Sequence, residues 1–270
     1  MRALELIDGW PSGRAVAGVV GPGGVLATRG DTGDRRPWAS VTKLLTAMAV
    51  LVAVEEGTIG LDDPAGPPGA TVRHLLAHAS GLAFEDDQIH APPGRRRIYS
   101  SRAFEVLAAV LAERAGMPFE RYLRDGVLTP LGMGSTELGP SAAASMEGPL
   151  DDLLKFAAEL RAPTLISDQT LQRATSVAYP GLDGVLPGFG RQRPLDWGLG
   201  FEIKDGKSPH WTGGQNSPGT FGHFGNRGSF LWVDPGAQLA LAVLSGSDFD
   251  QTWVRAAWPA LSDAVLVEFG

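Results

Sequence analysis

The strand-like segments of this 270-residue chain lie near its two ends, and a long middle without strand patterns separates them. Near the N-terminus, two β-like runs joined by Gly21-Pro22-Gly23 predict a hairpin. Strand patterns return only late in the chain. The five predicted strands cover Arg14 to Val20, Gly24 to Gly30, Trp197 to Ile203, Gly228 to Asp234 and Ala237 to Gly246. This distribution favours one antiparallel sheet built from both ends of the chain.

The middle of the chain carries helical spacing and helix stop signals. Lys43 to Val54 is apolar on nearly every side, which predicts a buried central helix. Further helices are predicted over Thr71 to Ala79, Arg102 to Ala115, Phe119 to Leu128, Pro149 to Leu160 and, closing the chain, Asp248 to Val265. We therefore predict an α/β (α+β) fold. An antiparallel sheet flanked by helices forms a lobe of residues 1–55 and 185–270, and residues 56–184 form an inserted all-helical lobe.

Composition excludes several kinds of function. The chain has no cysteine, so disulfides, thiol catalysis and thiolate metal sites are excluded. A formal charge of −7 repels a phosphate backbone, which argues against a nucleic-acid partner. Arg95, Arg96 and Arg97 follow acidic residues 85–87 in a loop and are predicted to be solvated or paired. Neither a secretory signal nor a membrane-spanning run is visible, so a cytoplasmic protein without a membrane partner is expected, and a processed exported form stays open.

A serine and a lysine three residues apart stand at the start of the predicted central helix, in Ser40-Val41-Thr42-Lys43. With 16 serines and four lysines in the chain, chance predicts fewer than one such pair. Serine is also an ordinary helix N-cap, which is the simpler interpretation. Lysine, however, is almost never fully buried without a partner, and Lys43 lies in the most apolar segment of the protein. Spacing of three puts both side chains on one helix face, within reach of a hydrogen bond.

Such a pair suits nucleophilic catalysis. A serine hydroxyl needs a neighbour that takes its proton, and a desolvated lysine has a lowered pKa that allows this. At the first turn of a helix, the N–H of Ser40 is also free to point at an oxyanion. No G-x-S-x-G, dinucleotide-binding or P-loop motif competes with this interpretation. His74 and His78 share a helix face but lack the further ligands of a zinc site, so we expect packing or capping histidines and no metal.

Two further motifs follow in order along the chain. Tyr99-Ser100-Ser101 precedes a predicted helix, and His223-Phe224-Gly225 lies before a strongly apolar strand. Together with the serine–lysine pair, they resemble the three motifs of serine β-lactamases and penicillin-binding proteins. The match is to the class C-type branch, which also contains D-Ala-D-Ala carboxypeptidases, D-aminopeptidases and esterases. The segments LLAHASGL and RYLRDGVLTPLGM resemble connecting segments of the same family, and the resemblance runs from about Gly13 to Gly246.

The resemblance implies a catalytic group. Ser40 would be the nucleophile, and Lys43 and Tyr99 would move its proton. Tyr99 would act as a phenolate or a hydrogen-bonded base, a role that requires the charge of Lys43 to lower the tyrosine's pKa. The backbone N–H groups of Ser40 and Asn226 would bind the oxyanion.

The resemblance also implies a substrate-binding group. Its members are Ser101, His223, Phe224, Gly225 and Arg227. Ser101 would orient the lysine and the substrate. His223 replaces the lysine of class C β-lactamases, a pattern of the peptidase and esterase members. Phe224 stands where the family usually has a threonine that helps to bind a carboxylate, and Arg227 would have to supply that contact instead.

We therefore predict a serine hydrolase that acts through an acyl-enzyme on a small ester or amide, without a cofactor. A D-Ala-D-Ala carboxypeptidase or weak β-lactamase is the alternative within enzymes. A penicillin-binding or sensing module without turnover is the alternative from another class. The expected partner is a small-molecule ester, amide or β-lactam, and no oligomeric state is predicted.

Overall fold

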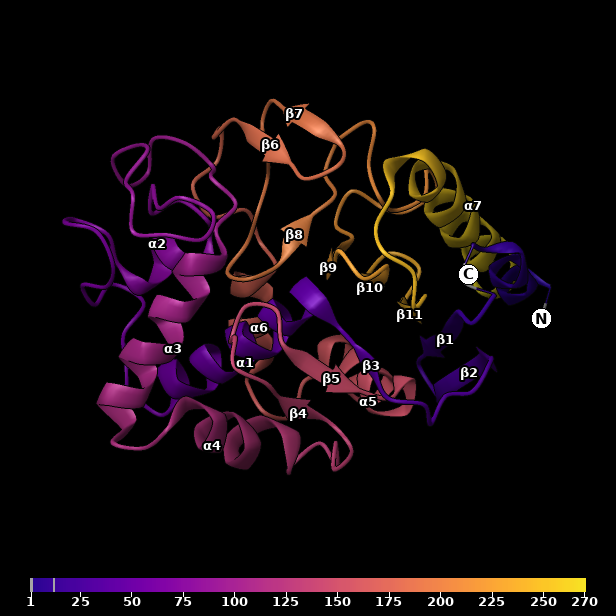
Figure 1. Ribbon diagram of the computed structural model, residues 1–270, viewed down its shortest axis with the longest axis horizontal. Helices are drawn as coiled ribbons and strands as arrows, with labels where there is room; N and C mark the ends of the chain where they lie inside the picture. Colours follow the sequence, from indigo (N-terminus) through magenta and orange to yellow (C-terminus); the bar gives the residue numbers. More distant parts are fainter. Residues whose placement is uncertain (1, 12) are drawn as a thin grey trace.

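A computed structural model describes residues 2–11 and 13–270 of the chain (Figure 1). Its main sheet has six strands in the order β2-β1-β11-β10-β9-β8, each antiparallel to its neighbours. The strands are β1 (Val16–Gly21), β2 (Gly24–Arg29), β8 (Glu202–Ile203), β9 (Phe221–Phe224), β10 (Ser229–Asp234) and β11 (Leu239–Leu244). Val16 on β1 lies opposite Leu244 on β11. The predicted antiparallel sheet built from both ends of the chain is confirmed.

Helices cover both faces of this sheet (Figure 1). On one face lie α7 (Gln251–Phe269) and η1 (Ala3–Gly9), and on the other lies α5 (Leu150–Arg161). Along β10, Phe230 and Trp232 join the core beneath α7, whereas Leu231 and Val233 join the core on the other face. Strands buried on both faces have no polar side, which explains why their sequences are continuously apolar.

The close approach of α5 depends on a glycine in β1. A Cβ atom at Gly18 would lie 2.7 Å from Cδ1 of Leu154 on α5. Residues 150–161, assigned by the sequence to the inserted helical lobe, therefore pack on the sheet. The division into lobes at residues 55/56 and 184/185 stays a prediction.

The remaining helices surround α1 (Thr42–Glu55). They are α2 (Val72–Leu76), α3 (Ser101–Ala115), α4 (Phe119–Leu123), η3 (Arg124–Leu128) and α6 (Asp168–Ala174). Every residue from Thr42 to Ala53 is buried, which confirms the buried central helix. Its packing partners include α3, α4 and η3. Within the residues that the structure describes, no helix is both long and apolar enough to cross a membrane.

Several short elements complete the structure. A three-stranded sheet contains β3 (Arg36–Pro37), β5 (Met146–Gly148) and β4 (Glu137–Leu138), and β6 (Gly184–Leu186) pairs with β7 (Gly190–Gln192). A single turn of 3-10 helix, η2 (Ala39–Val41), leads into α1. These segments are too short to show a hydrophobic period, so the sequence did not predict them.

Three predicted elements differ from the structure. The strand predicted over Trp197 to Ile203 is reduced to β8, because Gly200 adopts a left-handed φ of +94° that interrupts extended backbone. The helix predicted over Thr71 to Ala79 ends at Leu76, because His78 is left-handed with a φ of +52°. The last helix begins later than predicted, after its N-cap Asp250, and it continues to Phe269.

Candidate active site

The turn that carries Ser40 is fixed from both sides. Trp38 is fully buried, and its indole Nε1 donates to the Gly148 carbonyl at 3.0 Å. The Trp38 carbonyl accepts a 2.5 Å hydrogen bond from Ser229 Oγ of β10. Ala39 has a φ of +48°, a strained value for a residue with a side chain. Ser40 follows directly and is partly exposed. The hydrogen bonds of Trp38 therefore fix the backbone from which the Ser40 side chain extends.

Lys43 lies one helical turn after Ser40 and is fully buried. Its Nζ donates to Ser40 Oγ at 3.3 Å, to Ser101 Oγ at 3.1 Å and to the Ala143 carbonyl at 3.0 Å. Burial lowers the pKa of the Lys43 ammonium to about 7, although the charge of Glu105 acts in the opposite direction. The burial of Lys43, predicted from the sequence, is therefore confirmed. Near neutral pH the amine is free to take a proton from Ser40.

Tyr99 faces Ser40 from the segment before α3. Its ring centre lies 5.0 Å from Lys43 Nζ. Burial raises the pKa of the Tyr99 hydroxyl well above 10, and a hydrogen bond with Ser40 lowers it by less. The low pKa that a phenolate role would require is not found here, because burial of the Tyr99 hydroxyl outweighs the influence that lowers its pKa. Tyr99 is therefore a neutral hydroxyl at physiological pH, able to accept one proton while it donates another.

The position of Tyr99 follows from how α3 begins. Ser100 is the N-cap residue, and its Oγ accepts from the Ala103 N–H at 3.0 Å and donates to the Ala83 carbonyl at 2.6 Å. Ser101 is the first residue of α3 and contacts Lys43. One helix start therefore holds Tyr99 and Ser101 in place beside Lys43.

Strand β9 forms the opposite side of the site. Nδ1 of His223 donates to the Phe224 carbonyl at 2.7 Å, and burial together with the charge of Lys43 lowers the pKa of His223 to about 3. The imidazole is therefore neutral. Gly225 lets the end of β9 lie against the turn that carries Ser40, because a Cβ there would meet the Trp38 carbonyl oxygen at 2.7 Å.

A cavity of about 830 Å³ opens in front of Ser40. Tyr99, His223 and Asn226 line it together with Ser40. Much of its remaining wall is apolar, formed by Phe84, Ile98, Val185, Leu186, Pro187, Trp197, Phe224 and Phe249. Arg96 and Arg191 also line it. The space in front of Ser40 is therefore largely apolar.

Phe224 of the third motif lines the cavity, whereas Arg227, which follows this motif, does not. The Phe224 ring packs among aromatic rings, with its centre 5.7 Å from Phe249 and 5.6 Å from Trp211. Arg227 is exposed, and its guanidinium pairs with the Asp248 carboxylate at 2.7 Å. It is not among the described residues that line the cavity. The structure thus brings Ser40, Lys43, Tyr99, Ser101, His223, Phe224, Gly225 and Asn226 together and leaves Arg227 outside.

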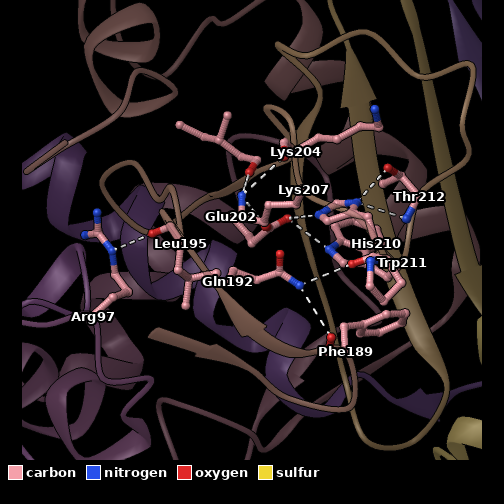
Figure 2. Close-up of polar contacts among 12 residues, drawn as sticks. Arg97, Phe189, Gln192, Leu195, Glu202, Lys204, Lys207, His210, Trp211 and Thr212 are labelled. Atoms are coloured by element: carbon pink, nitrogen blue, oxygen red, sulfur yellow. Dashed lines mark hydrogen bonds and ion pairs between the residues drawn. The ribbon is translucent and has the colours of Figure 1, made fainter. Parts of the chain in front are cut away.

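A second buried polar cluster is centred on Glu202 (Figure 2). The Glu202 carboxylate contacts Lys207 Nζ, His210 Nε2 and Trp211 Nε1, each at 2.9 Å. Burial opposes ionisation of Glu202, but its interactions with His210 and Lys207 outweigh this and lower its pKa to about 2. Because the Trp211 ring contacts Phe224, this cluster supports the cavity wall from behind. Among the described residues, no group of three or more His, Cys, Asp or Glu side chains is placed to bind a metal ion.

The sequence missed one buried charge beside the site. Arg97 was predicted to be solvated or paired with acidic residues, and this is wrong. It is 2% exposed and donates to the carbonyls of Leu195, Ala77, Ala178 and Tyr179. Burial lowers its pKa to about 10. Because these carbonyls come together only in the folded protein, no local sequence pattern indicates the burial of Arg97. Arg95 and Arg96 are exposed, as expected.

Comparison with known proteins agrees with this geometry. The family model named Beta-lactamase matches residues 14–265. A crystal structure of a beta-lactamase from Mycobacterium bovis is 56% identical, with a TM-score of 0.97 over 99% of both chains. The D-alanyl-D-alanine-carboxypeptidase/endopeptidase AmpH of Escherichia coli (strain K12) is 29% identical over 52% of this chain and 45% of AmpH. Esterase EstB of Burkholderia gladioli is 25% identical over 78% of this chain and 77% of EstB.

The fold and the family match define the class of the chain, which is a family of β-lactamase-like serine hydrolases. The chain belongs to the beta-lactamase family, as its residues 14–265 show. The family indicated by the three motifs and the predicted fold class are both confirmed. The match to AmpH spans less than half of that protein's length, whereas the M. bovis structure is matched over almost its whole chain.

Proposed function

We propose that the chain hydrolyses small esters or amides through an acyl-enzyme on Ser40, with Lys43 as the base. The observation that carries this proposal is the 3.3 Å contact between Lys43 Nζ and Ser40 Oγ, made by a buried lysine whose pKa is lowered to about 7. A neutral amine at hydrogen-bond distance is what a serine hydroxyl needs to become a nucleophile.

The reaction begins when Ser40 Oγ bonds to the carbonyl carbon and its proton passes to the Lys43 amine. The N–H groups of Ser40 and Asn226 stabilise the negative charge that develops on the carbonyl oxygen. As the leaving group departs, it takes the proton back from Lys43 through the Tyr99 hydroxyl. Water then attacks the acyl carbon along the same proton path, which releases the acid and restores the Ser40 hydroxyl.

Esters of apolar acids suit the cavity better than substrates with a carboxylate near the reacting bond. Phe224 offers no hydrogen bond at the position where the family usually has threonine. Arg227, the candidate to replace that contact, is already paired with Asp248. The apolar lining of the cavity supports the same preference. The competing function is β-lactam hydrolysis, favoured by the 56% identity with the M. bovis beta-lactamase.

A fluorophosphonate probe tests the nucleophile. One label is expected, on Ser40, and Ser40→Ala should abolish both the labelling and the hydrolysis of a p-nitrophenyl ester. Ser176→Ala is the control, because Ser176 is exposed at the end of α6. Labelling of another serine, or an active Ser40→Ala variant, would contradict the mechanism.

The ratio of kcat/KM for an ester to kcat/KM for a penicillin tests the substrate preference. The wild type should favour the ester. Phe224→Thr should shift the ratio toward the penicillin by about 1 to 2 kcal/mol if a single hydrogen bond to a charged group is restored. A wild type that processes penicillin faster than the ester, and loses that activity in Arg227→Ala, would establish the β-lactamase alternative.

A further inference from the structure

The loop after α2 carries a buried histidine for which the proposed reaction has no use. His78 is fully buried, and its left-handed backbone turns the chain away from α2. Burial is the main cause of a pKa well below 6.5, and the nearby charges of Lys43 and Arg97 act in the same direction. His78 is therefore a neutral imidazole throughout the physiological pH range.

Two hydrogen bonds connect His78 to the residues on either side of Tyr99. Its carbonyl accepts from the Ile98 N–H at 2.9 Å, and its ring Nδ1 accepts from the Ser100 N–H at 3.1 Å. Because Nδ1 is an acceptor, the ring proton must lie on Nε2. No described residue forms a hydrogen bond with Nε2, so the Ser100 N–H is the polar partner of this ring.

The ring of His78 also packs against Tyr99. The two ring centres are 4.7 Å apart, and Phe104 and Trp197 enclose the imidazole at 5.2 Å and 4.8 Å. The enclosed imidazole of His78 prevents the Tyr99 ring from moving away from Ser40 and Lys43. An error of about 1 Å in the position of a catalytic group can cost on the order of 10²-fold in rate.

We propose that His78 is a positioning residue that holds Tyr99 at the nucleophile through its Ser100 hydrogen bond and its ring contact. The inference rests on the proposed function, since it assumes that Tyr99 belongs to the proton path. His78 itself touches neither the substrate cavity nor the reacting atoms.

Two variants separate the hydrogen bond from the fold. His78→Asn places an amide oxygen near the position of Nδ1, whereas His78→Gly removes both acceptor and ring, and both residues accept a positive φ. For ester hydrolysis, His78→Gly should lower kcat on the order of 10²-fold with KM changed less than about twofold. His78→Asn should restore about tenfold of that loss. His74→Asn is the control, because His74 caps α2 and stacks on Tyr179 away from the site, and it should keep kcat within about twofold of wild type.

A double-mutant cycle with Tyr99→Phe decides the inference. If His78 acts through the Tyr99 hydroxyl, His78→Gly and His78→Asn should cost little further activity in the Tyr99→Phe background. Equal losses in both backgrounds would overturn the role of His78 and leave the proposed function intact. Full activity of Tyr99→Phe alone would overturn the assumed proton path and the inference together. Thermal unfolding verifies that each variant is folded, and His78→Asn carries the cycle if His78→Gly is not.

Discussion

The pH dependence of ester hydrolysis tests whether Lys43 is the base. Burial lowers the pKa of Lys43 from 10.5 to about 7. At about 1.4 kcal/mol per pKa unit, this change favours the neutral amine by about 5 kcal/mol. The neutral fraction is then about one half at pH 7, about one tenth at pH 6 and about one hundredth at pH 5. We expect kcat/KM to fall about tenfold for each pH unit below neutrality, because this parameter follows the ionisation of the free enzyme.

The assay measures the initial rates of p-nitrophenyl ester hydrolysis from about pH 5 to about pH 9, a range that spans the expected midpoint. Ser40→Ala supplies the background of spontaneous hydrolysis at each pH. An acid limb with its midpoint near neutrality supports a neutral Lys43 as the base. A flat profile down to pH 5, or a rate that still rises about tenfold per pH unit up to pH 9, would refute this reasoning.

Glu105 provides a second measurement on the same group. Its charge raises the pKa of Lys43, and its carboxylate accepts from the N–H groups of Ala142 and Ala143 at 3.2 Å. Glu105→Gln removes the charge and keeps the size, so the acid limb should move to lower pH. Glu113→Gln, at an exposed position of the same helix, should leave the limb unchanged. A shift to higher pH in Glu105→Gln would contradict the electrostatic argument.

Three further predictions concern stability and packing. Lys43→Met should abolish ester hydrolysis, and yet thermal unfolding should show a fold stabilised by about 1 to 4 kcal/mol at pH 7, because the buried ammonium of the wild type opposes folding at that pH. For the same reason, the stability of the wild type should rise as the pH increases from 7 toward 10.5. Gly225→Ala should lower kcat at least about tenfold by pushing β9 from the Trp38 carbonyl, whereas Gly134→Ala, with open space around it, should not. Glu202→Gln should destabilise the protein to urea by about 3 to 5 kcal/mol at pH 7, a difference present above pH 4.5 and lost as the pH falls toward 2.

The part of the site that the sequence predicts best is local. Ser40 and Lys43 are three residues apart at the start of one helix, so their contact follows from helix geometry and the apolar segment around them. Tyr99 and His223 were matched through a resemblance, because their approach to Ser40 depends on packing between distant segments. The sheet was predictable for a related reason, since its long central strands are continuously apolar.

Other features depend on the tertiary structure alone. The burial of Arg97 depends on carbonyls from four separate residues. The raised pKa of Tyr99 depends on how much protein surrounds its hydroxyl, which no motif records. Arg227 pairs with Asp248 because a loop brings the two together, and a strand pattern does not indicate which way its side chain turns.

The pairing of β1 with β11 has a consequence for biosynthesis. The β1–β2 hairpin and the helix that follows Ser40 leave the ribosome well before β11, the strand that completes the centre of the sheet. Until then one edge of β1 lacks its partner and is open to pairing with other chains. Contacts this distant along the chain also slow folding. Ser40 is therefore translated long before β9 can complete the candidate site, and the nascent chain carries this serine without the residues that surround it in the folded protein.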